Sequence, residues 1–131
     1  VELRPRVEQV ASMFLREIEL LFPKSFPLRI HGDLHLGNIL WGAEGPFLVD
    51  FDDIVSGPEM QDLWLITPGR EEEDRAQLRI LLEGYEEMRH FDRSTLQLIE
   101  PLRGLRFLHF ASWIGKRWND PIFPRYFESY G

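Results

Sequence analysis

The chain has 131 residues, 44% of them hydrophobic and 13% aromatic, which is enough for one packed domain and argues against a disordered chain. Its formal charge of −7 argues against a general affinity for nucleic acid or for anionic membranes. The absence of cysteine excludes a disulfide framework and a thiol nucleophile, and we expect a cytoplasmic protein without membrane or nucleic-acid partners.

The first predicted element is an amphipathic helix over residues 1–22, which Pro23 ends. Its apolar residues follow a helical spacing: Val7, Val10, Phe14, Ile18 and Leu21. Residues 26–30 are expected to lead in an extended conformation into a polar motif. The helix itself is expected to pack on a core and to have no role in chemistry.

The motif has two parts. Residues 31–40 are His-Gly-Asp-Leu-His-Leu-Gly-Asn-Ile-Leu, and residues 47–53 are Phe-Leu-Val-Asp-Phe-Asp-Asp. We predict strands over 38–41 and 47–49, because turn-forming residues lie between these two apolar runs at 42–46. Such a hairpin brings Asp50 back beside Asn38.

These residue types indicate phosphoryl transfer. A carboxylate and an amide oxygen suit Mg²⁺, which keeps most of its coordination shell for water and phosphate oxygens. The spacing His-x-Asp-x4-Asn, followed by a strand that ends in Asp-Phe, is the catalytic-loop and metal-aspartate pattern of kinases. It predicts Asp33 as the base for an attacking hydroxyl and Asn38 and Asp50 as the magnesium ligands.

Three further polar residues of the motif have weaker assignments. His31 is expected to brace the loop by hydrogen bonds rather than to bind a metal, and His35 is expected to act in a similar way. Asp52 stands where protein kinases have glycine. It is expected either to contact a second metal ion or, with a slight preference, to form hydrogen bonds within its loop.

The rest of the chain is predicted to be helical over 59–66, 69–89 and about 94–118. Ser94 and Gln97 match a capping box, and Pro101 predicts a kink or a restart. The apolar residues of the last helix are expected in a core or at an interdomain surface, and residues 120–125 are expected to break this helix. Asp62 either faces solvent or is a partly buried acceptor for backbone amides of the catalytic loop.

Two features that a complete protein kinase has are absent. The thirty residues before His31 contain no glycine and only one lysine, Lys24, so the loop and lysine that hold ATP phosphates are missing. Only eleven residues separate Asp50 from Asp62, too few for an activation segment. We therefore expect residues 1–131 to form a single domain, the C-terminal catalytic lobe of a kinase-like phosphotransferase whose ATP-cradling N-terminal lobe is absent.

Residues 31–40 together with 49–52 resemble the aminoglycoside phosphotransferase and choline kinase superfamily. Residues 57–64, 84–87, 99–103 and 117–121 further resemble the bacterial stress-response kinase A family, the RdoA-type serine/threonine kinases. The resemblance implies an α+β, mainly helical lobe of a two-lobed enzyme that uses ATP and Mg²⁺ to phosphorylate protein Ser or Thr during stress. It assigns Asp33 as the base, Asn38 and Asp50 as metal ligands, and Asp62 as the aspartate that braces the loop.

Other functions stay open at the level of sequence. The same chemistry could act on a small hydroxylated molecule, as in aminoglycoside, choline or homoserine kinases, and acidic residues would favour a cationic one. The isolated lobe could also serve only for binding, since we expect it to be inactive by itself. A His/Asp metallohydrolase fits worst, because the spacing suits Mg²⁺ better than zinc.

Overall fold

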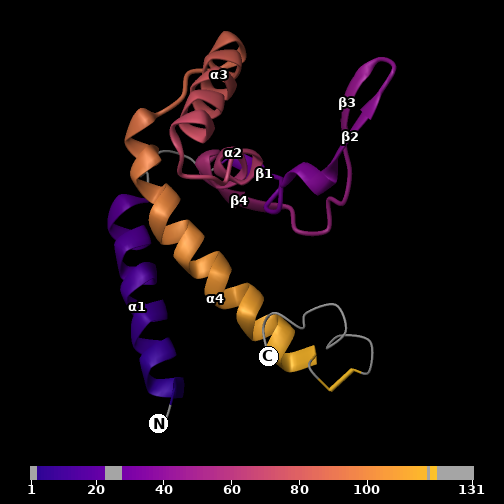
Figure 1. Ribbon diagram of the computed structural model, residues 1–131. Helices are drawn as coiled ribbons and strands as arrows, with labels where there is room; N and C mark the ends of the chain where they lie inside the picture. Colours follow the sequence, from indigo (N-terminus) through magenta and orange to yellow (C-terminus); the bar gives the residue numbers. More distant parts are fainter. Residues whose placement is uncertain (1–2, 23–27, 118, 121–131) are drawn as a thin grey trace. The chain divides into compact units, whose positions relative to one another are not determined.

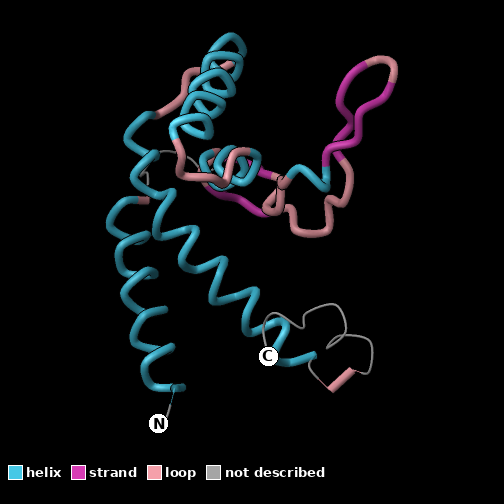
Figure 2. The backbone as a smooth tube through the Cα atoms, viewed as in Figure 1, coloured by secondary structure: helices cyan, strands magenta, loops and turns pink. Residues whose placement is uncertain are grey.

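The computed structural model describes residues 3–22, 28–117 and 119–120, and it divides into two compact units (Figure 1). One unit comprises Val1–Leu20 with Glu100–Gly131, and the other comprises Leu21–Ile99. Helices dominate, and the strands form two short antiparallel ladders, which confirms the predicted α+β class (Figure 2). None of the helices among the described residues has the length and apolarity that crossing a membrane requires.

The first unit contains helix α1 (Leu3–Leu21), which confirms the helix predicted at the start of the chain. The predicted apolar stripe is only partly buried. Phe14 is half-buried, whereas Val7 and Val10 are exposed. The expectation that this helix packs on a core is therefore wrong for Val7 and Val10, which no described side chain covers sufficiently to bury.

The second long element of this unit is helix α4 (Ile99–Arg117). Gly104 lies so close to α1 that a Cβ atom there would approach the Phe14 ring to 2.5 Å, so glycine permits the two helices to meet. Phe110 stacks on Trp113 at 5.8 Å between ring centroids. Phe107 is 67% exposed, so not every apolar residue of this helix lies in a core. Trp118 lies outside the described residues, and so does the predicted helix break over 120–125 apart from Asp120.

The larger unit contains helices α2 (Met60–Ile66) and α3 (Glu72–Met88), close to the predicted 59–66 and 69–89. A reciprocal capping box begins α3: the Glu71 side chain accepts from the backbone of Asp74, and the Asp74 side chain accepts from the backbone of Glu71. The core of this unit consists of buried apolar side chains from several of its elements: Ile30, Met60, Leu63, Trp64, Leu65, Leu82, Phe91 and Leu98.

The segment before α4 differs from the prediction. It is a 3₁₀ helix, η2 (Arg93–Leu98), and its N-cap is Asp92, whose carboxylate accepts from the Ser94 backbone at 3.0 Å and from its hydroxyl at 2.7 Å. These hydrogen bonds lower the pKa of Asp92. The predicted Ser94–Gln97 capping box is wrong, because Ser94 donates to the cap instead of serving as one. Pro101 is the third residue of α4, so the predicted restart is confirmed.

The predicted hairpin is confirmed with shifted bounds. Strand β2 (Ile39–Gly42) pairs with β3 (Gly45–Leu48), and only residues 43–44 form the turn. Pro46 lies opposite Trp41 in the ladder rather than in the turn. This two-stranded sheet tolerates proline because an edge strand does not need every N–H for pairing.

A second ladder was not predicted. Strand β1 (Leu28–Ile30) precedes the catalytic motif and pairs antiparallel with β4 (Val55–Gly57), which follows the Asp50 loop. The register sets Ile30 opposite Val55. Because the two strands run side by side, the loop that follows β1 and the loop that precedes β4 leave the ladder at the same end.

Candidate active site

The start of the catalytic loop is held by a carboxylate from α2. The two oxygens of Asp62 accept hydrogen bonds from the backbone N–H groups of His31 at 2.7 Å and of Gly32 at 2.9 Å. Asp62 is only 8% exposed, so these amides provide polar partners that a buried carboxylate needs. The geometry matches the buried-acceptor alternative for Asp62 and not the solvent-facing one.

Gly32 brings the two loops of the motif into direct contact. Its φ angle is +87°, which favours glycine, and a Cβ atom there would overlap the backbone carbonyl of Asp53. The sequence gives only a weak signal for this glycine, because its partner lies twenty-one residues later and meets it through the unpredicted β1–β4 ladder.

Gly32→Ala is expected to destabilise the chain by about 2–3 kcal/mol, because alanine adds backbone strain and an overlap with Asp53. Gly84→Ala in α3 is the matched control: a Cβ atom at this position would have no atom within 4 Å, so alanine there should be neutral or stabilising by about 0.5–1 kcal/mol. Urea unfolding of both variants measures the difference. Equal urea midpoints for Gly32→Ala and Gly84→Ala would show that Gly32 does not lie against the carbonyl of Asp53.

His31 connects the catalytic loop to the strand that leads to Asp50. Its Nε2 lies 2.8 Å from the carbonyl oxygen of Val49, and since a carbonyl only accepts, this nitrogen carries the proton. Its ring also packs at 4.8 Å, centroid to centroid, on the ring of Phe51. His31 is buried, and hydrogen bonds of both its ring and its backbone N–H hold the loop in place.

Asn38 makes the second connection. Its side-chain Nδ2 donates to the backbone carbonyl of Asp33 at 2.9 Å, and its own backbone carbonyl accepts from the N–H of Val49 at 3.1 Å. The side chain is buried at the end of the 3₁₀ turn η1 (Leu36–Asn38). With Nδ2 committed to Asp33, Oδ1 is the atom of this amide that remains for a cation.

Asp50 directly follows Val49 and has a φ angle of +63°, the one positive φ angle among described residues other than glycine. Strained backbone of this kind concentrates at functional sites, and aspartate tolerates it better than most residues. The residue is exposed, so its carboxylate is accessible from solvent. The hydrogen bonds of Val49 to His31 and Asn38 thus place the backbone of Asp50 next to both sides of the catalytic loop.

The donor set fits magnesium. One carboxylate from Asp50 and one amide oxygen from Asn38 are hard oxygen ligands, and Mg²⁺ binds through few of these while retaining water and phosphate oxygens. Within residues 3–22, 28–117 and 119–120, the structure contains no group of three or more His, Cys, Asp or Glu side chains arranged for a metal ion. Asn38 Oδ1 and the Asp50 carboxylate are the two groups of these loops that could hold such an ion.

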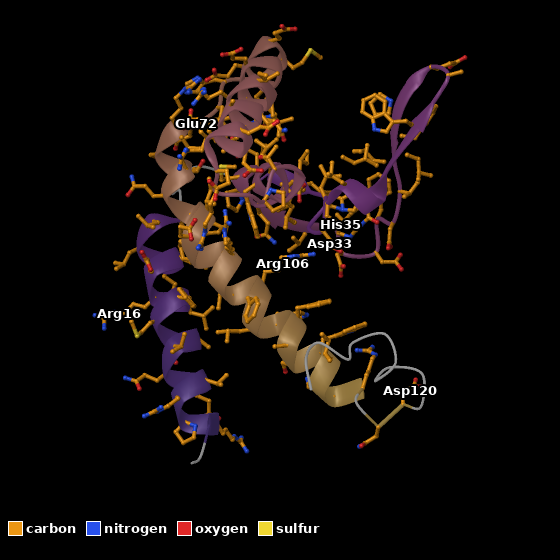
Figure 3. The ribbon with its side chains drawn as sticks, in the orientation of Figure 1. Arg16, Asp33, His35, Glu72, Arg106 and Asp120 are labelled. Atoms are coloured by element: carbon orange, nitrogen blue, oxygen red, sulfur yellow. The ribbon has the colours of Figure 1, made fainter. Side chains whose placement is uncertain are left out.

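Asp33 and His35 lie next to each other in this loop (Figure 3). His35 Nε2 is 3.5 Å from Asp33 Oδ2, and His35 Nδ1 accepts from the Gly37 N–H at 3.0 Å. The side chain of Asp33 is 26% exposed, and because its Oδ1 is buried, Oδ2 is the oxygen that an acceptor molecule can reach. The structure brings Asp33, Asn38 and the backbone of Asp50 together, while Asp52 and Asp53 are exposed on the following turn.

A cavity of about 450 Å³ adjoins the loop but does not include the proposed base. Its lining is mainly apolar and includes His31 and Asp62, but not Asp33. Tyr85 also lines the cavity. Burial raises the pKa of its hydroxyl, and the negative charge of Glu59 raises this pKa further. The cavity is therefore bordered by residues that hold the loop and not by the proposed base.

A mainly helical α+β chain with two interlocked polar loops is the class of protein in which this family is found by sequence comparison. Residues 1–99 match the phosphotransferase enzyme family, and the chain belongs to that family. Over 100 residues it is 49% identical to Stress response kinase A of Escherichia coli K12 and of Salmonella typhi, and to the Serine/threonine protein kinase RdoA of Salmonella typhimurium LT2. The aligned part is 76% of this chain and 30% of each relative, so the chain spans about a third of their length. The resemblance predicted from the sequence is confirmed.

Proposed function

We propose that the protein transfers the γ-phosphoryl group of ATP to a hydroxyl group in a Mg²⁺-dependent reaction. The main support is the double connection made by Asn38, whose side chain donates to the Asp33 carbonyl while its own backbone carbonyl accepts from Val49. This residue joins the proposed base to the segment after β3 that leads to Asp50. ATP as donor agrees with the cytoplasmic location expected from the sequence.

Each proposed role follows from a donor or acceptor group of the chain. Asp33 orients the acceptor hydroxyl and takes its proton as the new oxygen–phosphorus bond forms and ADP leaves. Asn38 Oδ1 and the Asp50 carboxylate would hold Mg²⁺, which would supply positive charge to neutralise the phosphates. Asp62 and His31 keep the loop in place. No covalent intermediate with the enzyme is needed.

The metal assignment predicts that Asp50→Asn raises the Mg²⁺ concentration for half-maximal transfer at least about tenfold, because a neutral amide binds the cation less well. The measurement is transfer of labelled phosphate from ATP by the full-length protein across a magnesium titration, with a chelator as blank. Asp52→Asn is the matched comparison: a similar shift would make Asp52 a second metal contact. An unchanged magnesium requirement in Asp50→Asn would remove Asp50 from the metal site.

The proposed acceptor is a Ser or Thr hydroxyl of a protein in a bacterial stress response. It is supported by the name of the relative from Salmonella typhimurium, a serine/threonine protein kinase. A screen of labelled transfer to protein extracts against small alcohols, aminoglycosides, choline and homoserine separates this acceptor class from the alternative. Transfer confined to a small molecule would replace the protein acceptor and leave the chemistry unchanged.

We also propose that this chain supplies the C-terminal lobe and that the ATP phosphates are held elsewhere in a longer protein. The chain spans 30% of the relatives that it matches, and residues 1–30 contain no glycine. Calorimetric titration of Mg·ATP into this chain and into the full-length protein tests the proposal. Tight binding by the 131-residue chain alone would contradict it.

A further inference from the structure

The second histidine of the loop, His35, has no part in the function proposed above, although its ring contacts two groups of the site. Nδ1 accepts from the Gly37 backbone N–H at 3.0 Å, and Nε2 lies 3.5 Å from Asp33 Oδ2. Figure 3 shows the labelled side chains of His35 and Asp33 beside each other. The ring therefore lies between the turn that contains Asn38 and the carboxylate of the proposed base, Asp33.

The hydrogen bond to Gly37 determines which ring nitrogen carries the proton. A neutral imidazole has one donor and one acceptor nitrogen. Because a backbone N–H can only donate, Nδ1 is the acceptor and Nε2 carries the hydrogen. That hydrogen lies on the side of the ring that is nearest to the Asp33 carboxylate.

The orientation of the ring is determined by the backbone around it. His35 is the N-cap of η1, with φ −96° and ψ 167°, and its side chain caps the turn through Gly37. Asn38 ends the same turn, and its Nδ2 donates to the Asp33 backbone carbonyl at 2.9 Å. The turn thus fixes Asp33 through its main chain and the His35 ring at the same time.

We propose that His35 is a positioning residue whose Nε2–H holds Asp33 Oδ2, so that the carboxylate faces the acceptor hydroxyl. This inference rests on the proposed function. The 3.5 Å separation is long for a hydrogen bond, and such contacts often shorten when the substrate binds. His35 takes no proton in the reaction: the acceptor proton goes to Asp33, and the phosphoryl group passes from ATP to the acceptor oxygen.

Two variants separate this role from simple capping of the turn. His35→Asn places an amide oxygen near the position of Nδ1, so it keeps the acceptor for Gly37 but is too short to reach Asp33. His35→Gln carries an amide N–H to about the position of Nε2, so it keeps the donor to Asp33 but lacks the close acceptor. We expect His35→Asn to lower kcat about 10–100-fold and His35→Gln to retain kcat within about threefold.

The experiment compares kcat and KM for ATP in the full-length protein, with the thermal midpoint of each variant measured alongside. KM for ATP should change less than about threefold in both variants, because His35 contacts the base rather than the nucleotide. His109→Asn, an exposed histidine of α4, controls for loss of an imidazole and should match wild type.

A wild-type kcat in His35→Asn, or a kcat for His35→Gln no better than that for His35→Asn, would overturn the proposal and leave His35 as a turn cap at most. Imidazole ¹⁵N chemical shifts of His35 provide a readout that does not need activity. A proton on Nδ1 instead of Nε2 would also overturn the proposal. If wild-type protein transfers no phosphate from ATP to any acceptor, the proposed function fails before the variants are compared.

Discussion

Asp33→Asn is expected to lower the rate of phosphoryl transfer about 10³-fold, within the range that general-base catalysis contributes. Asparagine has nearly the shape of aspartate but cannot take a proton from the acceptor. The loop should keep its structure, because Asn38 bonds to the backbone carbonyl of Asp33 and not to its side chain. The affinity for Mg·ATP should therefore stay within about threefold of wild type.

The measurement is single-turnover transfer by the full-length protein, combined with calorimetric titration of Mg·ATP. Asp53→Asn is the matched control: it removes the same charge from the exposed neighbouring loop and should leave the rate unchanged. A similar loss in both variants would indicate a general electrostatic effect. Ordinary turnover by Asp33→Asn would remove Asp33 from the role of base.

The residues of the candidate site could be proposed from the sequence because they lie close to one another along the chain. The spacing from His31 through Asp33 to Asn38 falls within one loop, and Asp50 follows a short apolar strand that pairs with the strand next to Asn38. The hairpin pairs residues that lie close in sequence, so turn formers between two apolar runs were sufficient to predict it. The predicted bounds of the turn, 42–46, were wrong because Gly45 and Pro46 also fit an edge strand.

The contacts that hold the loops together could not be predicted in the same way. Strand β4 has three residues, too few for an alternating pattern, and its partner β1 lies twenty-five residues earlier. The approach of Gly32 to Asp53 depends on this ladder, and the capping of η2 by Asp92 depends on a turn geometry that the sequence does not distinguish from an α-helix. The sequence placed Asp62 on a helix that follows a Gly-Pro turn and left two alternatives for it, solvent or the amides of the catalytic loop, because the choice depends on how α2 packs against the loop.

Asp62 is the residue at which this packing can be tested most directly. Asp62→Ala removes the acceptor for two backbone amides, those of His31 and Gly32, and leaves both without the partner they have in the native structure. An unsatisfied buried donor costs about 1–3 kcal/mol, so the expected loss of unfolding free energy is about 3–5 kcal/mol.

Asp62→Asn is expected to restore only part of this stability, because its amide offers one acceptor oxygen and turns an N–H toward the second donor. Urea unfolding of both variants gives the free energies, and amide hydrogen exchange at His31 and Gly32 reports the loop itself. Glu83→Ala on the exposed face of α3 controls for the loss of one negative charge and should lie within about 0.5 kcal/mol of wild type. If Asp62→Ala were as stable as this control, α2 would not be the element that holds the catalytic loop, and the positions of Asp33 and Asn38 would depend on the hairpin alone.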